Sequence, residues 1–183
     1  MNKLLKGSIA GAAGIALLLG GAGTLALWND SETITGGTIT AGELELTVVG
    51  SGVWTDQNDD VIDLDDYRIV PGDELTYTAS FDVSAVGDNL SATVDIAEGS
   101  IAAATPNDAE DEALASFLTD SATIAIDGGA AVAAGSPIAV SDGETVTVAV
   151  TISFSNGIAG TENGAMNGAV NLGDFAVELT QVV

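Results

Sequence analysis

Apolar and polar residues alternate along several stretches of the chain, a pattern typical of β-strands that bury one face. The clearest stretch is 75–83, where Leu, Tyr, Ala, Phe and Val take every second place and Thr, Ser and Asp stand between them. The stretches 90–96 and 146–154 repeat this pattern. Because the alternation is one-sided, we expect antiparallel sheets with a solvent-facing surface, and not a parallel sheet covered by helices on both faces.

Shorter stretches complete the predicted sheets. At 44–48 apolar residues alternate with Glu45 and Thr47, and we expect Gly50 and Gly52 to end this strand. About seven to nine strands at this spacing predict a mainly β protein folded as an antiparallel β-sandwich, with a jelly roll as the preferred topology. Further short strands are predicted at 124–126, 138–140 and 175–179.

One short helix is predicted between the strands. Asn107 is expected to cap it, because Glu110 follows three residues later as in a capping box. The first turns are rich in acidic residues, which the helix dipole favours at this end. Leu114, Phe117 and Leu118 then follow at helical spacing, so we expect the helix to close one end of the sandwich.

The N-terminal residues have the layout of a secretory signal. Lys3 and Lys6 precede a long uncharged and largely apolar run, and small residues stand near its end. We expect a signal helix in residues 1–26, with cleavage between Ala26 and Leu27. A retained membrane anchor is the alternative, since the apolar run is barely long enough to span a bilayer. In either case the membrane is contacted only through this segment.

The rest of the chain divides into a linking segment, 27–42, and a predicted sandwich domain, 43–183. The linking segment carries short strand-like pieces around Ile34 and Ile39, separated by two glycines. A strand-like segment with little of its own to bury can pair with the open edge of a sheet in another molecule. Pairing within its own sheet is the alternative.

Composition excludes several functions. The chain has no Cys and no His, so disulfides, thiolate metal sites and a Ser/His/Asp triad are absent. It carries 27 acidic residues against three basic ones, of which Arg68 alone would remain after removal of the signal. Such a charge repels nucleic acid and anionic lipid and favours solubility. No catalytic constellation is apparent, and we do not expect an enzyme or a bound cofactor.

An acidic loop is the candidate metal site. Asp56, Asn58 and Asp60 place oxygen ligands at alternate positions, as a calcium loop does. The pattern then departs from an EF-hand, since Val61 stands where Gly is needed and Tyr67 where Glu is needed. An unspecific Ca²⁺ site and an exposed acidic turn are both compatible with this loop.

Two stretches resemble a known family. They are GAGTLALWND at 21–30 and TITAGELEL at 38–46, and the turn VPGD at 70–73 agrees with them. Together they resemble proteins exported with the alternate signal peptide that the SipW-type signal peptidase removes, the TasA and camelysin family. Trp28, where Phe is usual, and the strong acidity are departures from that pattern.

The resemblance implies a secreted jelly-roll subunit of extracellular matrix or biofilm fibres. Subunits of such fibres exchange strands, so Ile34 and Ile39 would be the anchors that one subunit donates to the next. The implied partners are copies of the same chain, other matrix proteins, and the SipW-type peptidase during export. The alternative function is a monomeric cell-surface adhesin or binding module with an acidic surface that holds calcium.

Overall fold

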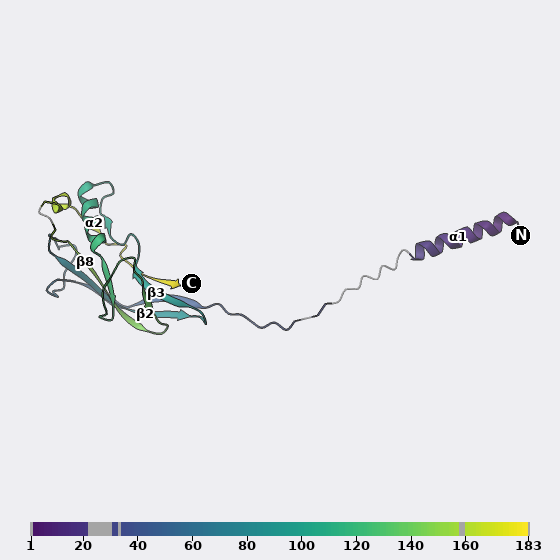
Figure 1. Cartoon of the computed structure of the whole chain (residues 1–183), viewed down its shortest axis with the longest axis horizontal. Helices are drawn as coiled ribbons and strands as arrows, with labels where there is room; N and C mark the ends of the chain where they lie inside the picture. The colour runs from purple at the N-terminus through teal and green to yellow at the C-terminus, as the bar shows by residue number, and fades with distance from the viewer. Residues whose placement is uncertain (1, 22–30, 33, 158–159, 183) are drawn as a thin grey trace. The chain divides into compact units, whose positions relative to one another are not determined.

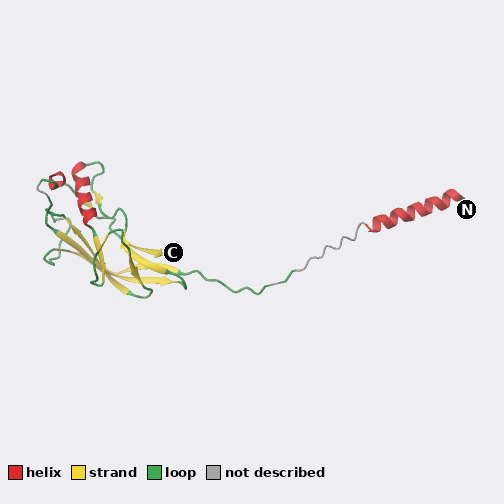
Figure 2. Ribbon diagram, viewed as in Figure 1, coloured by secondary structure: helices red, strands yellow, loops and turns green. Residues whose placement is uncertain are grey.

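The computed structural model describes residues 2–21, 31–32, 34–157 and 160–182. The chain divides into two units, residues 1–39 and residues 40–183, and the second unit is called the body below. The first contains α1 (Lys3–Gly21), and the body holds the strands and α2 (Figures 1 and 2). The elements of the body are β1 (Glu43–Asp56), β2 (Glu74–Val86), β3 (Ser91–Ile96), β4 (Ala102–Ala103), α2 (Ala109–Ser121), β5 (Thr123–Ile126), β6 (Val132–Ala133), β7 (Ile138–Val140), β8 (Thr145–Ser153), the 3-10 helix η1 (Glu162–Ala165), β9 (Val170–Asn171) and β10 (Val177–Val182).

Two antiparallel sheets form the body. The larger has the strand order β1-β2-β8-β5-β6 and the smaller the order β10-β3-β7, while β4 and β9 pair separately. Every described pairing is antiparallel. The predicted mainly β, antiparallel architecture is therefore confirmed.

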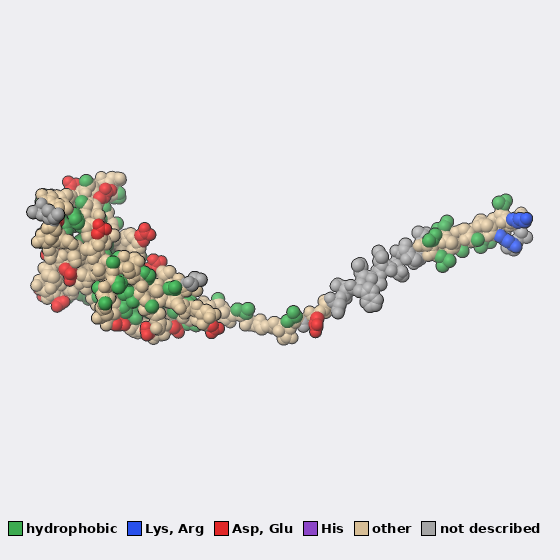
Figure 3. Space-filling view, in the orientation of Figure 1, with side chains coloured by type: hydrophobic (Ala, Val, Ile, Leu, Met, Phe, Trp, Pro, Cys, Tyr) green, Lys and Arg blue, Asp and Glu red, His purple; other side chains and the backbone are tan. Residues whose placement is uncertain are grey.

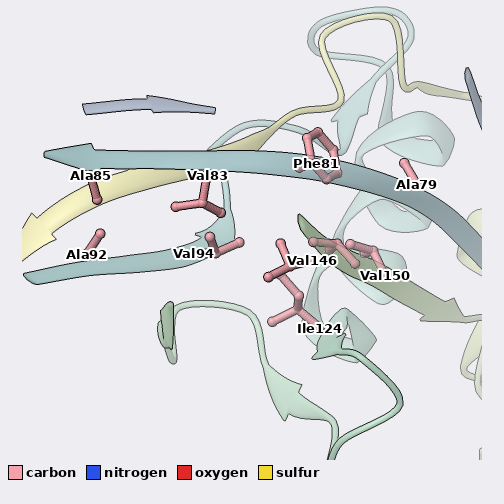
Figure 4. Packing of buried hydrophobic residues seen from close by; sticks show 10 residues of the cluster. Ala79, Phe81, Val83, Ala85, Ala92, Val94, Ile124, Val146 and Val150 are labelled. Carbon is pink, nitrogen blue, oxygen red and sulfur yellow. The ribbon is translucent and has the colours of Figure 1, made fainter. Parts of the chain in front are cut away.

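The sheets pack face to face around a common core, as in a β-sandwich. The buried side chains of β2, β5 and β8, all in the larger sheet, pack with those of β3 from the smaller sheet, and Figure 4 shows these residues together. Val94, Ile124, Val148 and Val150 are completely buried there. The predicted one-sided alternation is also correct, because polar residues occupy the other face of β2 and β8. On that face the Oγ1 atoms of Thr76 and Thr151 lie 3.1 Å apart and form a cross-strand hydrogen bond.

A second apolar cluster joins α2 to one end of the larger sheet. Leu114 and Leu118 of α2 pack with Leu75 of β2 and with Ile152 and Phe154 at the end of β8. We call this the helix end of the body. The opposite end, where β1 begins beside Val86, is called the exit end, because the linking segment leaves the body there. The helix therefore closes one end of the sandwich, as predicted.

The first strand of the sheet is longer than predicted. β1 runs through Gly50 and Gly52 to Asp56, and its register with β2 shifts between Val49 and Val53. Gly50 has a positive φ of 79°, a conformation that glycine adopts at a β-bulge without strain. The expectation that the two glycines end the strand is wrong, since they form a bulge within it.

The predicted helix is present, but its cap is the next residue. Asp108 has extended backbone angles and its carboxylate accepts a hydrogen bond from the Asp111 amide, 3.2 Å away. Asn107 instead has a positive φ of 66°, and its amide donates to the Glu112 carboxylate at 3.1 Å. Asn107 therefore belongs to the turn before the cap, and Asp108 supplies the oxygen that the first helical amides need.

Within residues 34–42 the chain forms no strand, contrary to the strand-like pieces predicted around Ile34 and Ile39. A β-prone segment keeps strand geometry only when a neighbouring strand satisfies its backbone groups. The described residues 34–42 have no strand assignment, and pairing in another molecule and pairing within its own sheet both remain predictions for this segment.

Candidate assembly surfaces

The linking segment presents two isolated apolar side chains. Ile34 is 89% exposed and Ile39 is 97% exposed. Gly36 and Gly37, which separate them, have no other part of the molecule within 4 Å of the side-chain position. Both predicted anchors therefore lie in a described part of the chain where nothing covers them. The predicted cleavage residues Ala26 and Leu27 lie outside the described residues.

The point where this segment joins the body is tightly packed. A side chain at Gly42 would collide with the carbonyl oxygen of Val86, so the backbone must pass closely over the end of β2. A hollow of about 780 Å³ surrounds this join, between the β2–β3 turn and the turn before β8. Asp142 lines it and accepts a hydrogen bond from the Ala85 amide at 2.7 Å. Asp142 therefore ties the turn before β8 to the end of β2, beside the join.

A larger groove of about 1140 Å³ lies at the helix end. One wall is the loop 64–71 and the other is the stretch 162–173, which includes η1 and β9. We call it the helix-end groove. Beneath it lie the side chains that join α2 to the sheet, Leu75, Leu114, Leu118, Ile152 and Phe154, which are buried and form its floor. The apolar side chains exposed in the groove belong to its walls, Val70 to the first and Met166 to the second.

The first wall of this groove is shaped by Asp73, in the turn that resembles the VPGD motif. Its carboxylate accepts hydrogen bonds from the Val70 amide at 2.9 Å and from the Tyr67 hydroxyl at 3.3 Å. Burial, and then the negative charge of Asp73, raise the pKa of the Tyr67 hydroxyl. Gly72, with a φ of 106°, donates its amide to the Phe154 carbonyl and so ties the loop to β8.

The second wall is tied to α2 by a buried carboxylate. Asp111 is 7% exposed, and its two oxygens accept hydrogen bonds from the Ala169 amide at 2.7 Å and from the Thr105 amide at 2.9 Å. The Ala169 amide, with Thr105 and against the effect of burial, holds the pKa of this carboxyl below its ordinary value. Asp111 therefore joins the helix, the loop before it and the groove wall.

Replacing Asp111 by Asn should lower the melting temperature by several degrees at neutral pH, because one of the two amides then faces an NH₂ group instead of an acceptor. The lowered pKa means that the carboxylate stabilises the fold above its unfolded-state pKa of about 3.9, and that this contribution is lost as the pH falls through the folded-state value. The difference from the wild type should therefore shrink on acidification. Thermal unfolding followed by circular dichroism between neutral and acidic pH measures both effects.

The matched control is Asp120→Asn, which removes one negative charge from an exposed position of the same helix. This variant should unfold at the wild-type temperature or slightly above, since an acidic residue near a helix C-terminus is unfavourable. Equal melting temperatures for the two variants would contradict the assigned role of Asp111.

Arg68 lies at the rim of the helix-end groove. Its guanidinium donates to two backbone carbonyls, that of Tyr67 at 3.0 Å and that of Asp65 at 3.3 Å. Within the described residues it forms no ion pair, although the chain is rich in carboxylates. The charged side chains visible on the body in Figure 3 are acidic. The sequence identifies Arg68 as a rare basic residue, but it does not predict that Arg68 lies beside an apolar groove.

In the acidic loop, the Asp56 carboxylate accepts its hydrogen bonds from residues of the same loop. Asp56 accepts hydrogen bonds from the Asn58 amide at 2.9 Å, the Asn58 side chain at 3.0 Å and the Asp60 amide at 3.0 Å. The Asn58 amide is the main cause of the lowered pKa of Asp56. The three candidate calcium ligands are therefore neighbours, and among the described residues no three His, Cys, Asp or Glu side chains form a cluster that could hold a metal ion.

Three aromatic rings that are far apart in the sequence meet between β1, β2 and the start of β10. Trp54, Tyr77 and Phe175 have ring centroids 5.3–5.4 Å from one another. Gly52 makes this possible, because any side chain there would overlap the Tyr77 ring. The three rings are half-buried. Tyr77 and Phe175 pack against the main core, and Trp54 packs against the cluster at the helix end.

Within the described residues, no helix combines the length and hydropathy needed to cross a membrane. Comparisons of the chain with protein-family models, curated protein sequences and solved structures find no match.

Proposed function

We propose that this chain is an exported structural protein, a subunit of extracellular matrix or biofilm fibres that assembles with copies of itself by strand exchange. In this proposal α1 belongs to a signal peptide, residues 1–26, which a SipW-type peptidase removes between Ala26 and Leu27. The processed chain then works outside the cell, in the matrix or on the surface. Its partners are further copies and other matrix proteins.

The observation that carries the proposal is the state of the linking segment. Ile34 and Ile39 are almost fully exposed in a β-prone stretch that forms no strand within the described residues 34–42. Exposed apolar side chains on an unpaired backbone are unfavourable in an isolated molecule, and another subunit's sheet can satisfy both the backbone and the side chains. Strand donation explains why this stretch has the composition of a strand but lacks a strand's partner.

The strand pairings also support a jelly-roll-like topology. β2 pairs with β8, β3 with β7, and β5 with β6, so the pairs nest inside one another along the chain. Nested pairing is what results when a long antiparallel hairpin is rolled into two sheets, as in a jelly roll. β1 and β10 extend the two sheets at one side of this arrangement.

Deleting residues 31–40 should abolish filament formation by the processed protein. Loss of both isoleucines and of the backbone that would join the next subunit removes the donated strand, while the body begins only at β1. Light scattering measures high-mass assembly, and electron microscopy establishes whether the particles are filaments.

Two double variants refine this test. Ile34→Ser with Ile39→Ser should prevent assembly as the deletion does, whereas Thr35→Ser with Thr38→Ser should leave it nearly unchanged, because these residues are not the apolar anchors. A deletion variant that still forms filaments would refute strand donation. A wild-type protein that stays monomeric and retains cells or glycans would identify the chain as an adhesin instead.

A further inference from the structure

We propose that the helix-end groove of one molecule receives the linking segment of a second copy, with Ile34 against the exposed apolar side chains of its walls and Glu32 paired with Arg68. This inference rests on the proposed strand exchange and identifies the surface that accepts the strand.

Reach excludes the groove of the same molecule. Eight residues separate Ile34 from Gly42, which spans at most roughly 26–29 Å when fully extended. Val86, beside Gly42, and Leu75, on the groove floor, are eleven positions apart on β2, or roughly 36 Å at about 3.3 Å per residue. The segment therefore cannot place Ile34 in its own groove, and a groove that it fills must belong to another molecule.

The two ends of the body then give the contact a direction. The segment leaves at the exit end, and the groove opens at the helix end of the same sheet. A contact between two different surfaces at opposite ends is heterologous, and repetition of such a contact produces an open filament unless its rotation closes a ring. The positions of the segment and the groove are therefore those that a linear polymer needs.

The groove also contains a free strand edge. Among the described residues β9 pairs with β4 alone, and both of its residues, Val170 and Asn171, line the groove. An extended segment can pair with the second edge of β9 through main-chain hydrogen bonds, while alternate side chains enter the groove. The short β4–β9 pair would become a three-stranded sheet when the groove is filled.

Charge specifies the register of the segment. Arg68 is the base that remains in the processed chain, and it has no ionic partner in the described residues. Glu32 is the acidic residue of the segment 31–42 and lies two positions before Ile34. In an extended strand these two residues project to the same side, so Ile34 in the groove brings Glu32 toward the rim where Arg68 lies.

Cross-linking between two single-cysteine variants tests the contact directly, because the chain has no cysteine of its own. Processed Thr35→Cys protein is mixed with Val70→Cys protein, assembled, and treated with a short bismaleimide cross-linker. Val70 lines the groove and is 55% exposed, and the matched control Val86→Cys lies at the exit end and is 50% exposed. We expect a covalent dimer of Thr35→Cys with Val70→Cys and none with Val86→Cys.

A charge exchange tests the pair. Arg68→Glu and Glu32→Arg should each lower the rate of assembly about tenfold or more, since each places like charges together, and the double variant should recover most of it. Filaments that form without the Val70 cross-link, or with the Val86 one, or a double variant without recovery, would overturn the groove assignment and leave strand exchange standing. Absence of filaments from the wild-type protein would overturn both.

Discussion

Replacing Ile152 by alanine should lower the free energy of unfolding by about 2–5 kcal/mol, the range for deleting most of a fully buried aliphatic side chain. Ile152 is completely buried at the end of β8, where it packs in the cluster that includes Leu75, Leu114 and Leu118. The loss combines the transfer free energy of the missing methyl and methylene groups with the cavity that they leave. Urea denaturation followed by circular dichroism measures this change.

The same substitution at Ile39 is the matched control. This side chain is 97% exposed, so Ile39→Ala should change the free energy of unfolding by no more than about 0.5 kcal/mol. Ile152→Ala should also weaken the joint between α2 and the sheet, because its side chain forms part of the groove floor. An Ile152→Ala protein as stable as the Ile39→Ala protein would show that this cluster is not a core.

The strands that the sequence predicted best are those with long alternation. β2, β3 and β8 bury one residue in two, and the hydrophobic effect acts on that pattern before any tertiary detail is known. The bulge in β1 was missed for a physical reason. A glycine can end a strand or form a bulge within it, and the local sequence does not distinguish the two. The bulge is favoured here because the Tyr77 ring lies against Gly52, which a side chain would overlap.

The helix cap was missed by one position for a similar reason. Asn107 and Asp108 are both good caps, and local sequence does not decide between them. The Glu112 carboxylate holds the Asn107 amide locally, at the start of the helix. Asp111, whose amide Asp108 caps, is also held by Ala169, a contact made only in the folded body.

The candidate site was predictable only in part. The sequence identified Ile34 and Ile39 as candidate anchors because they are apolar residues in a polar segment. Both side chains are exposed, so the surface that they bind is not part of their own segment. The helix-end groove had no local signal, since its walls at 64–71 and 162–173 are almost one hundred residues apart. Gly72 and Asp73 hold the first wall, and Asp111 holds the second. The same holds for the ring cluster, whose members Trp54, Tyr77 and Phe175 come from three separate stretches.

Assembly of the processed protein should accelerate about 10- to 1000-fold as NaCl is raised from low to high ionic strength, the range over which electrostatics changes association rates. Each processed molecule carries 27 acidic residues against Arg68, so two approaching bodies repel one another. The screening length falls from about 30 Å at 0.01 M salt to about 3 Å at 1 M, which removes repulsion between all but adjacent charges. The Glu32–Arg68 pair is also screened, but it is a single attraction among many repulsions. Light-scattering kinetics across a salt series measures the effect, and equal rates throughout would show that the acidic surfaces do not approach one another.

Comparing CaCl₂ with NaCl distinguishes screening of the acidic surface from specific binding of Ca²⁺. At equal ionic strength, CaCl₂ and NaCl should accelerate assembly to a similar extent if charge screening alone acts. Should the acidic loop bind Ca²⁺, calcium would be the stronger of the two, and Asp60→Asn would remove the excess while leaving the response to NaCl unchanged. Asp60 is the informative position because Asp56 already accepts three hydrogen bonds within the loop, so its replacement would disturb the turn itself. An excess that survives in Asp60→Asn would place the calcium effect on other carboxylates of the acidic surface.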